Sequence, residues 1–168
     1  TTALAFKLRG AVVSINCFDP RAVNYQPNAW SIIQDLGINI IRVLGGVEGD
    51  WWHLNIKNHP DDWAQNLAAF LSEADYHNVK VIFHEMGNQW GTMFGIYPAI
   101  SVSEAKSLVD KLAGNNVLGH NFLTDSRVLV WTVANEPDIT VQTTLDWIIQ
   151  VSDYIRSKGG KTVVASPR

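Results

Sequence analysis

The most constraining feature of this sequence is an uninterrupted apolar run that stops abruptly at polar residues and a proline. Residues 127–137 read Arg-Val-Leu-Val-Trp-Thr-Val-Ala-Asn-Glu-Pro. A run of this length, rich in β-branched side chains, is typical of a strand that is buried on both faces of a sheet. Pro137 cannot donate a hydrogen bond to a neighbouring strand, so it ends the strand. Asn135 and Glu136 are therefore expected at the carboxyl end of a buried strand.

The rest of the chain alternates strand-like and helix-like segments. Strands are predicted over residues 8–15, 38–44, 79–83, the run described above and 162–165. Helices are predicted over 29–36, from 60 to about 76, from 101 to the glycine at 114, and from about 145 to the glycines at 159–160. This alternation calls for a parallel sheet with right-handed crossovers. It predicts one α/β domain over 1–168, a partial barrel of the parallel (β/α) TIM type with about four and a half βα units.

Apolar residues recur at helical spacing, which predicts the buried face of each helix. The predicted inward residues are Trp30, Ile33 and Leu36 in the first helix, Trp63, Leu67, Phe70, Leu71 and Ala74 in the second, Ala105, Leu108, Val109 and Leu112 in the third, and Leu145, Ile148, Ile149, Ser152 and Ile155 in the fourth. Ser101 and Glu104 have the spacing of a capping box, in which each side chain bonds the backbone N–H of the other residue. The third helix is therefore expected to follow Ser101.

Composition narrows the classes of partner. A net charge of −3, without any run of Lys or Arg, gives no electrostatic reason to expect a nucleic acid or an anionic membrane surface. No apolar run is long enough to span a bilayer. The single cysteine, Cys17, excludes an intrachain disulfide. The sequence starts without Met and without a signal-peptide pattern, which favours a processed or trimmed start.

Polar residues near the ends of the predicted strands are the candidates for chemistry. Arg42 lies late in the second strand, His84 follows the third, and Asn135 and Glu136 end the fourth. Catalytic groups of a parallel barrel lie at the carboxyl ends of its strands. Glu136 leaves an apolar strand, where partial desolvation would raise its pKa, as a general acid requires.

Each candidate also has a structural alternative. Glu136 could cap the next helix, with help from Pro137 and Asp138. Arg42 could form an ion pair with an acid in the loop that follows it, and His84 could be an ordinary polar residue at the rim of the sheet. The acids available to Arg42 are Glu48 and Asp50.

These residues carry a resemblance to a known family. The chain resembles the N-terminal half of a clan A glycoside hydrolase barrel, most closely the cellulase/mannanase family (family five). The matching positions are Arg9-Gly10 in the first strand, Arg42, His84 and Asn135-Glu136-Pro137. The resemblance implies a retaining endo-β-glucanase or β-mannanase with Glu136 as the general acid/base. It also implies that Asn135 bonds the sugar 2-hydroxyl, that Arg42 orients the nucleophile and that His84 lines the subsite nearest the cleaved bond.

The same resemblance leaves the nucleophile unassigned. In the family it is a Glu that ends the seventh strand, and only five strands are predicted in this chain. A retaining site needs that second carboxylate about 5–5.5 Å from the first. We therefore expect the nucleophile outside this chain and no activity from the chain alone. The open sheet should be covered by a missing C-terminal half or by self-association. By analogy with the family, secretion is favoured.

Aromatic residues in the predicted loops are candidates for contact with sugar, because aromatic rings stack on the apolar faces of sugars. Trp51, Trp52 and Trp90 lie in loops that follow strands. The alternative for Trp51 and Trp52 is a loop that packs on itself. Trp30, Trp63 and Trp147 are predicted in the core, and Trp131 could serve either purpose.

The sequence gives no motif for a metal or an organic cofactor. His84-Glu85 does not start a zinc motif, because Asn88 stands where the second His would be required. The glycines at 45–49 follow a strand but do not form a dinucleotide fingerprint or a phosphate-binding loop. No metal and no cofactor are therefore predicted. Two rivals stay open: a non-catalytic carbohydrate-binding barrel, and an unrelated α/β enzyme in which Asn-Glu-Pro is coincidental.

Overall fold

The computed structural model describes residues 7–22, 24–44, 62–83, 100–135 and 137–165 of the chain. Its elements, in chain order, are β1 (Gly10–Ser14), the 3₁₀ helix η1 (Ile15–Phe18), α1 (Ala29–Asp35), β2 (Ile40–Leu44), α2 (Trp63–Tyr76), β3 (Lys80–Phe83), α4 (Val102–Leu112), the 3₁₀ helix η2 (Phe122–Thr124), β4 (Val128–Asn135), α5 (Gln142–Ser157) and β5 (Thr162–Ala165). All five predicted strands and all four predicted helices are present, with ends that differ from the predicted ones by a few residues.

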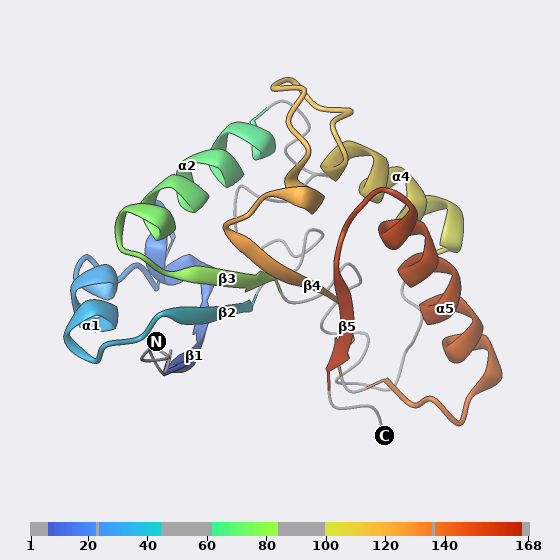
Figure 1. The fold of residues 1–168 in the computed structure, drawn as a ribbon, viewed down its shortest axis with the longest axis horizontal. Coiled ribbons are helices and arrows are strands. Elements are labelled where there is room, and N and C mark those ends of the chain that lie inside the picture. Colours follow the sequence, from blue (N-terminus) through green and yellow to red (C-terminus); the bar gives the residue numbers. More distant parts are fainter. Residues whose placement is uncertain (1–6, 23, 45–61, 84–99, 136, 166–168) are drawn as a thin grey trace, which may run out of the picture.

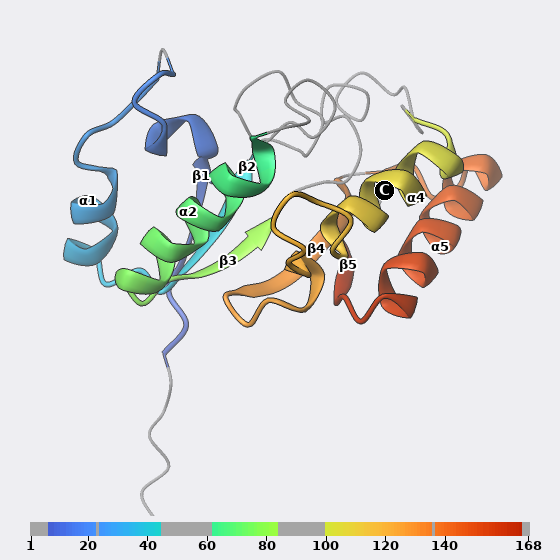
Figure 2. The same cartoon turned by 90° about the horizontal axis from the view of Figure 1, so that it is seen from above.

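The five strands form one parallel sheet in the order β1-β2-β3-β4-β5. The sheet is curved, and the helices lie along its outer, convex side (Figure 1). Seen from above, α1 and α2 flank the first three strands, while α4 and α5 lie together over the last two (Figure 2). This architecture confirms the predicted partial (β/α) barrel. β1 and β5 are the two edge strands.

The core lies between the sheet and the helices. Alternate strand residues face the helices, so Ile41 and Val43 of β2 and Val81 and Phe83 of β3 are buried. In β4 the ring of Trp131 stacks on Phe83, with centroids 4.6 Å apart and planes 13° apart. Such offset stacking adds to the stabilisation that burial of the two rings provides.

The helix-facing aromatic residues confirm most of the predicted core. Trp63 and Trp147 are buried, and the indole N–H of Trp147 donates to the backbone oxygen of Ile100 at 2.8 Å. Trp30 is partly buried and packs against the core. Trp131, for which sequence left two readings, is a core residue, only 2% exposed.

The predicted helix faces are correct except at Leu36, Leu145 and Ile149. Leu145 is only partly buried and is not on the buried stripe of α5. The capping box of Ser101 and Glu104 is formed in full at the start of α4. Leu36 and Ile149, however, are exposed and not inward. Leu36 comes after the last residue of α1 and is its C-cap. The buried stripe of α5 instead runs through Thr144, Trp147, Ile148, Val151, Ser152 and Ile155, which leaves Ile149 on the outer side.

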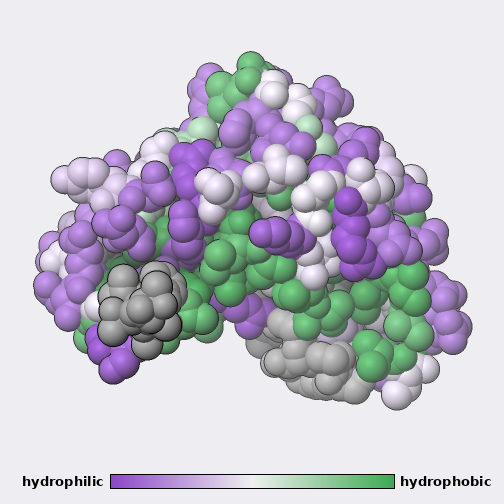
Figure 3. All heavy atoms as spheres, in the orientation of Figure 1, coloured by the Kyte–Doolittle hydropathy of each residue, from purple (hydrophilic) through white to green (hydrophobic). Residues whose placement is uncertain are grey.

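The other, concave face of the sheet carries a different set of side chains. Val12 of β1 is in register with Arg42 of β2, Arg42 with Ile82 of β3, and Ile82 with Val130 of β4. Val12 and Val163 of β5 are exposed. Figure 3, which has the orientation of Figure 1 and does not face the concave side, shows hydrophobic residues across the middle of the molecule, where the strands lie. Within the described ranges no helix covers this face of the sheet (Figure 1). No helix among the described residues is long and apolar enough to cross a membrane.

The stack of Trp131 on Phe83 yields a prediction for stability. Trp131→Ala should lower the free energy of unfolding by about 3–5 kcal/mol, because it leaves a large cavity and removes the ring contact. Trp131→Phe should cost much less, since a ring remains on Phe83. Tyr76, an aromatic residue that is 79% exposed, offers a matched control. Tyr76→Ala should change stability by no more than about 0.5 kcal/mol. Urea unfolding followed by circular dichroism measures all three, and a small effect of Trp131→Ala would contradict the assignment.

Candidate active site at the carboxyl ends of the strands

The parallel register brings the carboxyl ends of the strands to one edge of the sheet. Ser14 at the end of β1 pairs with Leu44 at the end of β2. Val43 pairs with Phe83, which ends β3. Asn135, the last residue of β4, pairs with Ala165, the last residue of β5. The segments that follow each strand therefore all start at this edge, which is where active sites lie in barrels of this kind.

Arg42 lies near this edge, two positions before the end of β2. Its neighbours Ile41 and Val43 are buried toward the helices, so the Arg42 side chain points to the concave face, where it is partly buried. Its register partners on that face are Val12 and Ile82. The position agrees with the predicted orienting role, which stays a prediction.

Asn135 lies at the same edge, and the strand that carries it is irregular just before it. The pairing of β4 with β5 shifts between Thr132 and Ala134, so that Val133 is the extra residue of a bulge. Bulges change the direction of the side chains that follow them and are frequent beside active sites. The backbone of β4 is therefore re-aimed immediately before the Asn-Glu pair, a feature that the sequence did not reveal.

The other predicted site residues lie outside the described part of the chain. They are Glu136, His84, Trp51, Trp52 and Trp90. The two acids offered as alternative partners of Arg42, Glu48 and Asp50, lie outside it as well. Of the predicted site, the structure thus places Arg42 and the backbone of Asn135. Among the described residues, no group of three or more His, Cys, Asp and Glu side chains could hold a metal ion.

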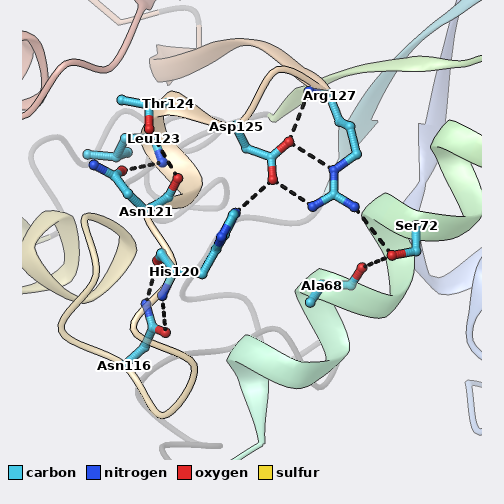
Figure 4. Close-up of polar contacts among 9 residues, drawn as sticks. All are labelled: Ala68, Ser72, Asn116, His120, Asn121, Leu123, Thr124, Asp125 and Arg127. Atoms are coloured by element: carbon cyan, nitrogen blue, oxygen red, sulfur yellow. Dashed lines mark hydrogen bonds and ion pairs between the residues drawn. The ribbon is translucent and has the colours of Figure 1, made fainter.

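The most elaborate polar network of the described residues is at the opposite end of the sheet. Asp125 precedes β4, and its carboxylate receives hydrogen bonds from Nε and Nη2 of Arg127 at 2.9 and 2.6 Å (Figure 4). His120 contacts the same carboxylate through Nε2 at 2.8 Å. Arg127 also donates from Nη1 to the hydroxyl of Ser72 in α2 at 3.3 Å. The network thus ties α2 and the loop before β4 to the amino end of that strand.

The electrostatics of this network follow from its geometry. The Asp125 side chain is 4% exposed. Burial alone would raise the pKa of the Asp125 carboxyl, but the hydrogen bonds from Arg127 and His120, with the guanidinium charge, hold that pKa well below its usual range. The amino ends of barrel strands serve stability, whereas the carboxyl ends serve catalysis. We therefore assign the Asp125 network to structure.

Comparison with known proteins supports the fold. No protein-family model matches the chain, and a search of curated proteins finds no match. Among solved structures, the chain is similar to the catalytic domain of Thermobifida fusca endoglucanase Cel5A, in a structure of a variant in complex with cellotetraose. The TM-score is 0.61 and the sequence identity 15%, and the match covers 96% of this chain and 48% of that one. A second structure of the same catalytic domain matches with a TM-score of 0.54 and 15% identity, over 83% of this chain and 41% of that one. The chain therefore has a cellulase-like α/β fold and spans about half the length of these structures.

The depressed pKa of Asp125 makes stability depend on pH. The stabilisation from the network is fully present above the usual aspartate pKa of about 3.9, and it is lost as pH falls through the lower pKa of the folded state. Asp125→Asn should lower the free energy of unfolding at pH 7 by about 3 kcal/mol, the low end for a broken buried ion pair, because Arg127 and His120 retain contact with water. The difference between parent and variant should shrink toward pH 3, as urea unfolding at several pH values can measure.

An exposed ion pair supplies the control for this experiment. Asp153 bonds Arg156 at 2.6 Å within α5, and both side chains are exposed. Asp153→Asn should change the free energy of unfolding by less than about 1 kcal/mol, because water screens the pair. An effect of Asp125→Asn that is equally small, or that does not vary with pH, would contradict the account of the network.

Proposed function

We propose that this chain supplies the acid/base half of a retaining glycoside hydrolase that acts on a β-linked glucan or mannan. The observation that carries the proposal is the position of Asn135, which ends β4 at the shared carboxyl edge and directly precedes Glu136 in sequence. The bulge at Val133 and the placement of Arg42 near the same edge support it. The endoglucanase domain with a similar fold binds cellotetraose, which favours a β-glucan-type ligand.

In the proposed reaction, Glu136 donates its proton to the glycosidic oxygen while a second carboxylate attacks the anomeric carbon. The bond to the leaving sugar breaks, and a covalent glycosyl-enzyme ester forms. Glu136, now ionised, then takes a proton from a water molecule, whose oxygen attacks the anomeric carbon and releases the second carboxylate. The nucleophilic carboxylate is not assigned to any residue of this chain.

The remaining predicted residues have binding and positioning roles in this proposal. Asn135 bonds the sugar 2-hydroxyl, Arg42 orients the nucleophile, and His84 lines the subsite beside the cleaved bond. Trp51, Trp52 and Trp90 offer rings on which further sugar units stack. The predictions for these three tryptophans rest on the sequence alone, which predicts loops after the second and third strands.

The role of Glu136 can be tested in the assembled enzyme. Glu136→Ala should nearly abolish hydrolysis of cello- or manno-oligosaccharides, because no acid then protonates the leaving oxygen. Azide should partly restore turnover of aryl glycosides with good leaving groups, since it attacks the glycosyl-enzyme without needing a base. Asp138→Ala, which removes an exposed carboxylate two positions further on, is the control and should retain activity. Unchanged hydrolysis in Glu136→Ala would contradict the assignment. The alternative is a carbohydrate-binding barrel. It is indicated if the parent shows no turnover and if the parent and Glu136→Gln bind oligosaccharide equally tightly.

The second part of the proposal concerns the rest of the barrel. A closed barrel of this kind has eight parallel strands. Apolar side chains are exposed mainly at the two ends of the described sheet. Those at the β1 end are Leu8, Val12, Tyr25, Ile32 and Leu36, and those at the β5 end are Ile139, Val141, Ile149 and Val163. We propose that further βα units, in a C-terminal half of the same protein, pair with both edge strands and cover these residues.

The behaviour of the 168-residue chain by itself tests this second part. Because no element of the described residues covers the two edge strands or the concave face, the isolated chain should self-associate and should not hydrolyse glucan or mannan. A variant with Val12→Lys in β1 and Val163→Lys in β5 should shift toward the monomer in light scattering, since a charge on an exposed edge strand opposes pairing. Tyr76→Lys, which changes an exposed residue away from both edges, should behave as the parent. A monodisperse parent monomer that turns over substrate would contradict the proposal.

A further inference from the structure

A pocket on the outer side of the helix layer is separate from the strand-end site. It lies between the segment that leaves the carboxyl end of β1, the start of α1 and the outer face of α2, and it has a volume of about 180 Å³. Its lining includes Phe18, Trp30 and Phe70. A cavity of about 150 Å³ is enough to admit benzene, so this pocket has room for one six-membered ring.

The aromatic residues of the pocket pack against one another and against the core. The ring of Phe18 lies 4.4 Å from that of Trp30 and 5.5 Å from that of Phe70, measured between centroids. Trp30 is held on another side by His77, whose ring stacks on it at 5.0 Å with planes 10° apart. Phe70 is buried in the core. These rings therefore need little rearrangement to receive a ligand, which lowers the entropic cost of binding.

The rim of the pocket carries a fixed cationic donor. Asp19 is buried, and its carboxylate accepts from Nε of Arg21 at 2.8 Å and from Nη2 at 3.2 Å. The backbone N–H of Arg21 donates to the same carboxylate at 2.9 Å. The guanidinium is thus oriented while its side chain stays 53% exposed. Among the described residues none accepts from its Nη1, which can therefore donate to a ligand.

A carboxylate on α2 completes the rim. Glu73 lines the pocket and its side chain is 62% exposed; its ion-pair partner among the described residues is His77, at 3.9 Å. The positive charge of Arg21 would repel a cationic ligand, and the negative charge of Glu73 would repel an anionic one. A neutral ring with hydroxyl groups suits both, because hydroxyls accept from a guanidinium and donate to a carboxylate. Its apolar C–H face would lie on the aromatic rings.

We propose that this pocket is a peripheral site for a single sugar ring of the polysaccharide, outside the strand-end site. The inference rests on the proposed function for the class of ligand, whereas the pocket itself is independent of Glu136. Phe18 and Arg21 belong to the segment that leaves β1 at the carboxyl edge, whereas Glu73 lies near the end of α2, which leads into the amino end of β3. The pocket therefore lies beside the sheet and not at the strand ends. A polysaccharide held there by one sugar ring stays bound to the protein while other parts of the polysaccharide are cut.

The test is a titration with cellotetraose and, separately, mannotetraose. It uses the assembled enzyme, ¹⁵N-labelled and carrying Glu136→Gln, so that hydrolysis does not consume the probe. The indole cross-peak of Trp30, assigned as the one that Trp30→Phe removes, should move in a saturable manner with at least one probe. Ala69→Phe fills the pocket from an exposed position of α2 and should abolish that movement. Ser107→Phe, the same kind of enlargement at an exposed position of α4, should leave it intact.

The outcomes separate this inference from the proposed function. In the assembled enzyme with Glu136 present, Ala69→Phe should retain hydrolysis of a small aryl glycoside, because the strand-end site is untouched. Suppose that the enzyme hydrolyses substrate, but that neither probe moves the Trp30 cross-peak or that the cross-peak moves equally in Ala69→Phe. The peripheral site would then be overturned, while the proposed hydrolase function would stand. A pocket-dependent movement in a protein without hydrolytic activity would support the peripheral site and reject the enzyme.

Discussion

Parallel pairing of the strands in chain order determines where Arg42 and Asn135 lie. The ladder holds Arg42 opposite Ile82 and ends β4 at Asn135, beside the end of β5. It is fixed from one side by the helices, through buried residues such as Val43, Phe83 and Trp131. Because a shift of one residue would turn all of these toward the wrong face, packing against the helices sets the register. The same register places Asn135 at the carboxyl edge.

Two Asp-x-Arg segments with the same local geometry lie at opposite ends of the sheet. In each, the arginine donates its backbone N–H and its Nε to the aspartate two residues before it: Arg21 to Asp19, and Arg127 to Asp125. The second pair is covered by His120 and linked to α2, so it stabilises the amino end of β4. The first pair leaves its guanidinium half exposed at the rim of the pocket, where it can meet a ligand. Position in the fold thus gives one local motif two different uses.

Sequence reasoning succeeded where a local rule and the fold agree. Element order, the capping box at Ser101 and the inward faces of α2 and α4 were all predictable, since each depends on residues a few positions apart. Ile149 was misplaced because two adjacent isoleucines fit the spacing equally well, and only contact with the neighbouring elements selects Ile148. The bond from Arg127 to Ser72 was missed because the two residues are 55 positions apart, and the bulge at Val133 because it depends on the register with β5. The Asp125–Arg127 pair is local, but nothing in the Asp-x-Arg pattern alone distinguishes it from the pair of Asp19 and Arg21.

The proposed function depends on the carboxyl end of β4. There, in the proposal, a carboxylic acid protonates a β-glycosidic bond while a carboxylate from outside this chain attacks the sugar. The stereochemistry of the product tests both halves of this claim at once. Hydrolysis of cello- or manno-oligosaccharide by the assembled enzyme, followed by proton NMR before mutarotation, should show the β-anomer as the first product, because two successive displacements retain configuration. Initial formation of the α-anomer, or no cleavage of either substrate, would contradict it.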